Sequence, residues 1–136
     1  MRVIFKNIKR DFSEEQILVI KEFTKVLQLN FPLKKDVDIF FDLVRRPDMT
    51  TGVRVDKHHI HVLSRERLLI DILRTLSHEW IHEFQHQIMG VKDTEKITNI
   101  GGPEENMAAM VASIILKKFQ NDFPKFRKIL YHENHF

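Results

Sequence analysis

His78-Glu79-Trp80-Ile81-His82 is the stretch that constrains the fold most, because it is an H-E-x-x-H motif with two metal-binding side chains one helical turn apart. Residues four apart on an α-helix differ by about 40° around its axis and about 6 Å along it. Both imidazoles can therefore reach one ion, and zinc binds neutral imidazole nitrogens at about 2.0–2.1 Å. Glu79, beside the first histidine, is placed to take a proton from a water on that ion. The motif predicts a zinc-binding helix and favours hydrolysis of an amide or an ester.

A second H-E-x-x-H, residues 82–86, overlaps the first. His78 and His86 are about 12 Å apart along a helix, so the three histidines cannot all bind one ion. Bulky apolar residues such as Trp80 and Ile81 surround the first pair, which is typical of a buried helix. Glutamate and glutamine flank the second pair, which is typical of an exposed surface. We therefore expect the metal to bind the first pair.

A catalytic zinc ion usually has three protein ligands and one water, so one protein ligand is still to be found. The chain has no cysteine, which excludes Cys-rich zinc sites and disulfides. Ile88 stands where the longer H-E-x-x-H-x-x-G-x-x-H pattern has its third histidine. A carboxylate from a later helix remains. Glu104 and Glu105 directly follow Pro103, a residue that suits the first position of a helix.

The helix face of each glutamate distinguishes the two candidates. Glu105 shares its face with small residues that would let two helices approach closely, namely Ala108, Ala109 and Ala112. Glu104 shares its face with larger apolar residues of an ordinary core. We favour Glu105 as the third ligand and keep Glu104 as the alternative. In a purely structural interpretation, both charges stabilise the helix N-terminus by a few tenths of a kcal/mol.

These residues carry a resemblance to a known family. His78-Glu79-x-x-His82 followed by Glu105-x-x-Ala108 resembles the gluzincin group of zinc metallopeptidases, and the small size resembles the minimal members called minigluzincins. The resemblance implies that His78, His82 and Glu105 bind Zn²⁺ and that Glu79 is the general base and acid. It also implies a zincin-like α+β fold. There, a small mixed sheet with a substrate-binding edge strand packs on the zinc helix, and a glutamate helix follows.

One position departs from the family pattern. Many gluzincins have an aspartate four residues after the ligand glutamate, where it supports a ligand histidine, and this chain has Ala109 there. Residues that orient a metal-binding histidine raise the affinity of the site. In this chain another residue must orient the ligand histidine, or the histidine is only weakly oriented.

Composition indicates one soluble domain over residues 1–136. Apolar residues make up 43% and charged residues 30%, a balance typical of globular proteins. Residues 1–8 are too short and too charged for a signal peptide, and no apolar run approaches the roughly 20 residues of a membrane span. With no cysteine, we expect a cytoplasmic protein without a membrane segment. The net charge of +3 comes with scattered basic pairs, so nucleic-acid binding is not favoured.

Periodicity and punctuation predict the elements. Ser13 with Gln16 forms a capping box that starts a helix. Alternating apolar residues predict short strands, of which 51–55 and 59–63 form a hairpin, and either of these two could be the edge strand that a substrate peptide joins. The expected strands are 2–8, 37–43, 51–55 and 59–63; the expected helices are 13–29, 64 or 65 to 89, 103–119 and 123–132; a loop covers 91–102 and a tail 133–136.

The function predicted from these residues is hydrolysis of peptide bonds in a peptide or protein substrate by zinc-bound water. The C-terminal segment adds Tyr131, His132 and His135 as candidates for an oxyanion donor or for a tail ligand. Folded back over the cleft, residues 132–136 would leave a latent enzyme. In the alternative interpretation, the chain is a non-enzymatic module in which zinc clamps two helices and the surface binds nucleic acid or a protein partner.

Overall fold

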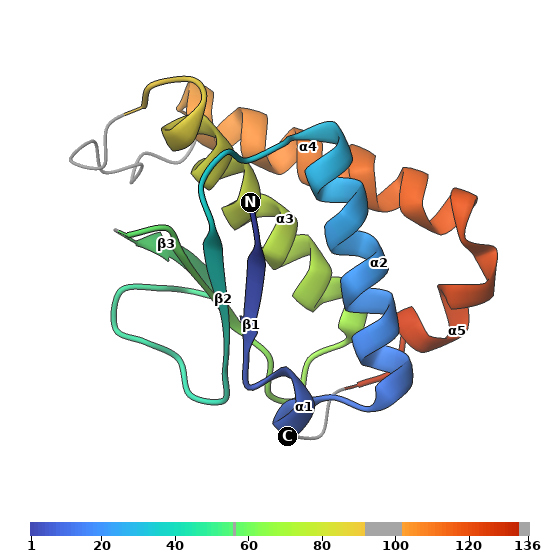
Figure 1. Cartoon of the computed structure of the whole chain (residues 1–136). Coiled ribbons are helices and arrows are strands. Elements are labelled where there is room, and N and C mark those ends of the chain that lie inside the picture. The colour runs from blue at the N-terminus through green and yellow to red at the C-terminus, as the bar shows by residue number, and fades with distance from the viewer. Residues whose placement is uncertain (56, 92–101, 134–136) are drawn as a thin grey trace.

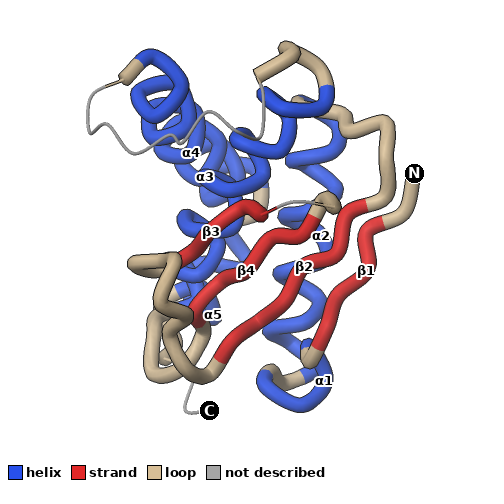
Figure 2. The backbone as a smooth tube through the Cα atoms, turned by 90° about the vertical axis from the view of Figure 1, so that its left-hand side faces the viewer, coloured by secondary structure: helices blue, strands red, loops and turns tan. Residues whose placement is uncertain are grey.

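The fold is α+β, with helices packed on one face of a small mixed sheet (Figures 1 and 2). The computed structural model describes residues 1–55, 57–91 and 102–133, so most of the loop expected over 91–102 and the tail after 133 lie outside it. The strands are β1 (Val3–Lys6), β2 (Val37–Asp42), β3 (Gly52–Val55) and β4 (His59–Leu63). Their order across the sheet is β1-β2-β4-β3, with β3 antiparallel to β4 and the other pairs parallel. The prediction of a small mixed sheet is confirmed.

The two longest helices described, α3 (Leu69–Gln87) and α4 (Pro103–Asp122), lie in the second half of the chain. Helix α3 packs against β3 and β4 and also against α4. Within the described residues, none of the helices is long and apolar enough to cross a membrane. The helices are α1 (Ile8–Asp11), α2 (Glu14–Asn30), α3 (Leu69–Gln87), α4 (Pro103–Asp122), the 3₁₀ turn η1 (Pro124–Phe126) and α5 (Arg127–Leu130).

Strand β2 shows why the sheet has one covered face. Val37, Ile39 and Phe41 alternate along it and are fully buried under the helices. Successive side chains of a strand point to opposite faces, so Asp38 and every second residue after it lie on the other face. The predicted strand with one wetter face is confirmed.

Several element boundaries differ from the prediction, for local reasons. The first strand was expected to reach Ile8 but ends at Lys6, because Asn7 has a left-handed backbone with φ of 69° and starts α1. The expected capping box is present, and Ser13 Oγ accepts a hydrogen bond from the Gln16 amide at 3.2 Å. The C-terminal helix is shorter than expected, since η1 precedes α5.

The metal-motif helix starts at Leu69, later than the expected Ser64 or Arg65. The Ser64 amide donates to the carbonyl of Asp42 at 3.0 Å and so continues the sheet. Glu66 has φ of 54°, a left-handed conformation that a right-handed helix cannot contain. The turn between the sheet and α3 therefore occupies residues where apolar periodicity alone predicted helix.

Helix α3 is held on two sides by close contacts. Trp80 is fully buried, and its Nε1 donates to the carbonyl of Phe31 at the end of α2 at 2.9 Å. Toward α4, the small residues Ala108 and Ala112 are buried at 0% and 1% exposure, which lets the two helix backbones approach. The expected small-residue face is confirmed at these two positions, whereas Ala109 is exposed.

The edge strand β3 approaches α3 through a glycine. A Cβ built on Gly52 would lie 2.4 Å from Thr75 Cγ2 and 3.2 Å from Glu79 Cγ. Real Cβ atoms do not approach other atoms that closely. The short distance between β3 and α3 is therefore possible only because Gly52 has no side chain. The contact sets the edge strand beside the centre of the metal-motif helix.

Replacing Gly52 with alanine should lower the free energy of unfolding by about 1–3 kcal/mol, because the added methyl group overpacks the contact with Thr75. The second substitution Thr75→Ser removes Cγ2 and keeps the hydroxyl, so the double variant should recover part of the loss. Urea unfolding of the two single variants and the double variant measures this coupling. Full additivity of the two substitutions would contradict a steric contact between these residues.

Candidate metal site

Three of the expected ligands come together between α3 and α4. The ligand atoms of His78, His82 and Glu105 all lie within 4.8 Å of one another. His78 Nε2 contacts one carboxylate oxygen of Glu105, and His82 Nε2 is 3.2 Å from the other. Donors on a tetrahedral zinc are about 3.3 Å apart when the bonds are about 2.0–2.1 Å. The cluster therefore has the donor types and the spacing to hold a metal ion.

Helix geometry explains how the sequence assembles this cluster. The rings of His78 and His82 are one turn apart, with centroids 4.8 Å from each other and planes at 74°. Glu105 comes from the first turn of α4, and Ala108 on the same face lets that turn come close to α3. The structure thus groups Glu105 with the histidines, and the carboxylate of Glu104 is not part of the group.

His82 has the environment of a neutral metal-binding imidazole. It is 7% exposed, and burial lowers its pKa, with the nearby His78 adding to the effect while Gln85 and Glu105 oppose it. Metal ions bind the neutral ring. The other ring nitrogen, Nδ1, lies 2.9 Å from Gln85 Oε1. Gln85 therefore holds the edge of the ring that is opposite Glu105, while Nε2 faces Glu105.

Glu79 lies beside the cluster in a desolvated position. It is 8% exposed, and burial raises its pKa to about 8, with repulsion from Glu105 adding to the shift and a hydrogen bond from the Arg54 backbone amide opposing it. A carboxyl group with a pKa near the working pH can both accept and return a proton. An acid–base group thus lies directly beside His78, the first candidate ligand in the sequence.

The second H-E-x-x-H register serves another purpose. Glu83 was expected on an exposed flank but is fully buried, since Arg54 Nε donates to its Oε1 and His58 Nδ1 to its Oε2, each at 2.6 Å. Gln87 Nε2 donates to Oε2 at 2.5 Å. The ring of His86 has its own contact, 2.9 Å from the Val91 carbonyl. This register therefore ties α3 to the β3–β4 hairpin.

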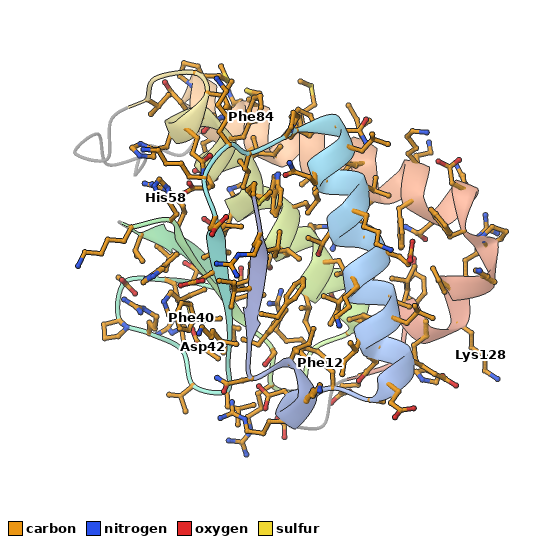
Figure 3. All side chains as sticks on the ribbon, in the orientation of Figure 1. Phe12, Phe40, Asp42, His58, Phe84 and Lys128 are labelled. Atoms are coloured by element: carbon orange, nitrogen blue, oxygen red, sulfur yellow. The ribbon has the colours of Figure 1, made fainter. Side chains whose placement is uncertain are left out.

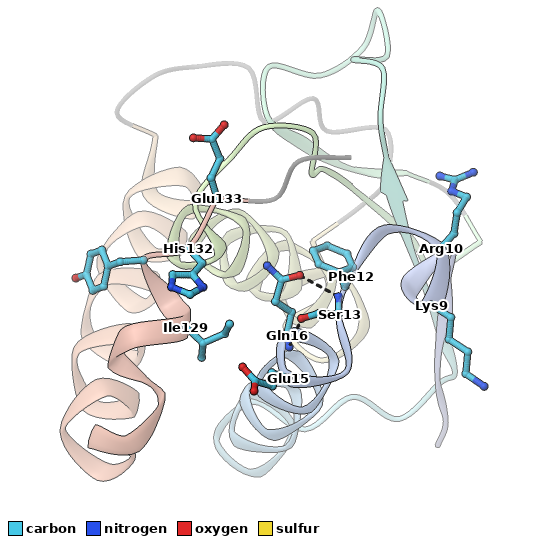
Figure 4. Close-up of a pocket in the computed structure, with 10 residues that line it drawn as sticks. Lys9, Arg10, Phe12, Ser13, Glu15, Gln16, Ile129, His132 and Glu133 are labelled. Atoms are coloured by element: carbon cyan, nitrogen blue, oxygen red, sulfur yellow. Dashed lines mark hydrogen bonds between the residues drawn. The ribbon is translucent and has the colours of Figure 1, made fainter.

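The C-terminal candidates lie elsewhere. Tyr131 Oη donates to Gln120 Oε1 at 3.2 Å, and Gln120 is about 22 Å along α4 from Glu105. The carbonyl of His132 accepts from Leu69 at the start of α3, and its ring lines a surface pocket next to the N-terminus of α2 (Figure 4). The structure does not bring Tyr131 or His132 to the metal cluster. His135 lies outside the described residues.

Two further histidines, His59 and His61, lie on the open face of the sheet. Figure 3 shows Phe40 and Asp42 on the side of β2 away from α2. The ring of His61 stacks on Phe40 with centroids 4.5 Å apart, and its Nδ1 is 2.8 Å from Asp42. Arg46 Nη1 lies 2.9 Å from its other nitrogen. His61 is thus enclosed by partners, although a strand histidine is more often exposed.

Sequence reasoning missed three residues that shape this site, namely Gly52, Arg54 and Gln85. Gln85 follows His82 by three positions, a helical spacing that could have indicated contact. Arg54 and Gly52 reach the site from β3, and nothing in their local sequence signals it.

No family model, curated protein or solved structure matches this chain. The geometry of the cluster is therefore the basis for any functional conclusion.

Replacing Glu79 with glutamine should remove a pH-dependent loss of stability from the metal-free protein. The folded-state pKa of about 8 exceeds the ordinary 4.5, so the folded protein keeps a proton that the unfolded chain releases. Stability from this group is fully present below about pH 4.5 and is lost as the pH rises through about 8. The difference in unfolding free energy, Glu79→Gln minus wild type, should therefore increase by about 3–5 kcal/mol as the pH rises from about 4.5 to about 8. Urea titrations in the presence of a chelator measure this difference. A constant difference would show that Glu79 titrates normally.

Proposed function

We propose that this chain is a zinc-dependent hydrolase of peptide bonds, with a zincin-like arrangement of the gluzincin type. The single observation that carries the proposal is the convergence of His78, His82 and Glu105 with Glu79 beside them. Two imidazoles and one carboxylate are the protein ligands of several catalytic zinc sites, which keep their fourth position for water or substrate.

The donor set supports zinc as the metal. Imidazole nitrogen suits zinc better than it suits calcium or magnesium, which prefer oxygen ligands. His78, His82 and Glu105 would hold the ion. A zinc ion in such a site lowers the pKa of water and polarises the carbonyl that is attacked.

Glu79 would move the protons of the reaction. Its carboxylate accepts one proton from the attacking water and passes it to the leaving amine. The close contact between α3 and β3 at Gly52 keeps the Glu79 carboxylate away from bulk solvent. This burial supports transfer of the proton to the substrate and not to water. The Arg54 amide fixes the carboxylate by a hydrogen bond.

The edge strand β3 supports an extended peptide as the substrate. The Leu63 amide donates to the Thr51 carbonyl at 2.8 Å, which fixes the pairing of β3 with β4. Backbone groups of an antiparallel strand alternate in direction, so Gly52 and Arg54 direct theirs to the free edge. The hydrogen bond from the Arg54 amide to Glu79 agrees with this direction. A peptide that adds to this edge would lie next to Glu79.

Replacing Glu105 with alanine should lower zinc affinity by more than about 100-fold, since losing a residue that merely supports a ligand already costs 10–100-fold. Glu104→Ala removes a neighbouring charge from the same helix turn and is the matched control, with unchanged affinity expected. Competition with a chromophoric chelator measures both variants. Equal losses in the two variants would indicate a general effect of helix charge and would remove Glu105 from the ligand set.

Glu79→Gln should keep zinc and lose peptide hydrolysis by about 10²–10⁴-fold, because a neutral amide cannot accept the proton. Zinc content and turnover of a panel of fluorogenic peptides give the two measurements. If the wild-type protein binds zinc but cleaves no peptide, the result favours the alternative in which the ion clamps α3 to α4 in a binding module. Full activity in Glu79→Gln would rule out Glu79 as the base.

A further inference from the structure

Gln85 is a fully buried polar side chain that joins the two segments bearing the proposed ligands. Its Oε1 lies 2.9 Å from His82 Nδ1, and its Nε2 donates to the backbone carbonyl of Glu104 at 2.9 Å. A buried carboxamide is stable only when its donor and acceptor are both matched. The side chain is therefore fixed at both ends.

These two contacts determine where the proton of His82 sits. The Glu104 carbonyl can only accept a hydrogen bond, so the amide nitrogen of Gln85 must face it. The amide oxygen then faces His82 and can only accept, which requires a hydrogen on Nδ1. In the neutral ring this leaves the lone pair on Nε2, the nitrogen that lies 3.2 Å from Glu105.

The second contact involves the third ligand. Glu104 directly precedes Glu105 in the first turn of α4, so a bond to its carbonyl constrains the position of the Glu105 backbone. Ala109, which stands where many gluzincins have the supporting aspartate, is exposed, and its side chain has no hydrogen-bonding group. Gln85 contacts both ligand-bearing segments from within α3.

We infer that Gln85 is the positioning residue of the metal site: it selects the tautomer of His82 that can bind an ion and holds the first turn of α4 at the same time. The inference rests on the proposed function, because it assigns a role at that site. Gln85 supplies through a neutral amide the support that a carboxylate gives in many metal sites.

Three variants test this role. Gln85→Met keeps the length of the side chain and removes both hydrogen bonds, so zinc affinity should fall about 10–100-fold. Gln85→Glu keeps the acceptor for His82 and loses the donor to Glu104, so it should bind zinc more tightly than Gln85→Met. Gln87→Met is the matched control. Gln87 lies on the same helix but bonds Glu83 and the Lys34 and Lys35 amides, so its loss should lower stability and leave zinc affinity unchanged.

A measurement on the metal-free protein gives an independent readout. Long-range proton–nitrogen NMR spectra of the imidazoles distinguish a ring protonated on Nδ1 from one protonated on Nε2. Wild type and Gln85→Glu should show His82 with hydrogen on Nδ1. Gln85→Met should shift the ring toward the Nε2 tautomer, which a purely structural role of Gln85 would not do.

The outcomes separate this inference from the proposed function. If wild type binds zinc and Gln85→Met binds it equally tightly with an unchanged tautomer, Gln85 has no positioning role while the function stands. Losses of affinity that match between Gln85→Met and Gln87→Met would also overturn the role, since they would follow stability alone. If wild type binds no zinc, both the function and the role fail.

Discussion

The close packing of α3 against α4 is the constraint on which the candidate site depends. A glutamate side chain is short, so Glu105 reaches the two histidines only if the helix backbones approach each other. Ala108 and Ala112 allow this approach, since larger side chains at these buried positions would separate the helices. The same contact buries the apolar residues of both helices and brings together candidate ligands that are far apart in the chain. Stability and site geometry thus come from one interface.

Helix α3 carries several polar side chains into the interior, and two of them have closely matched partners. Glu83 is matched by Arg54 and His58, and Gln85 is matched by His82 and the Glu104 carbonyl. Buried polar groups are costly when unmatched and specify one arrangement when matched. The helix is therefore fixed in register against the hairpin on one side and α4 on the other. Such a rigid support suits a site whose ligands must keep their spacing.

Local patterns in the sequence were sufficient for much of the fold. The alternation in β2, the capping box at Ser13 and the spacing of His78 and His82 depend on near neighbours, and each appears as expected. The start of α3 was missed because Glu66 adopts a left-handed conformation that periodicity does not encode. The buried state of Glu83 depends on Arg54, a partner distant in sequence. Burial set by such distant partners cannot be read from local pattern.

Trp80 has a consequence for the orientation of the whole helix. Its indole is held between α2 and the core by the bond to the Phe31 carbonyl, and it lies between His78 and His82 in sequence. A rotation of α3 by about 20° would displace atoms about 6 Å from its axis by about 2 Å, which is the length of a zinc–nitrogen bond. The buried indole and its bond to Phe31 therefore help to fix the rotation of α3 about its own axis.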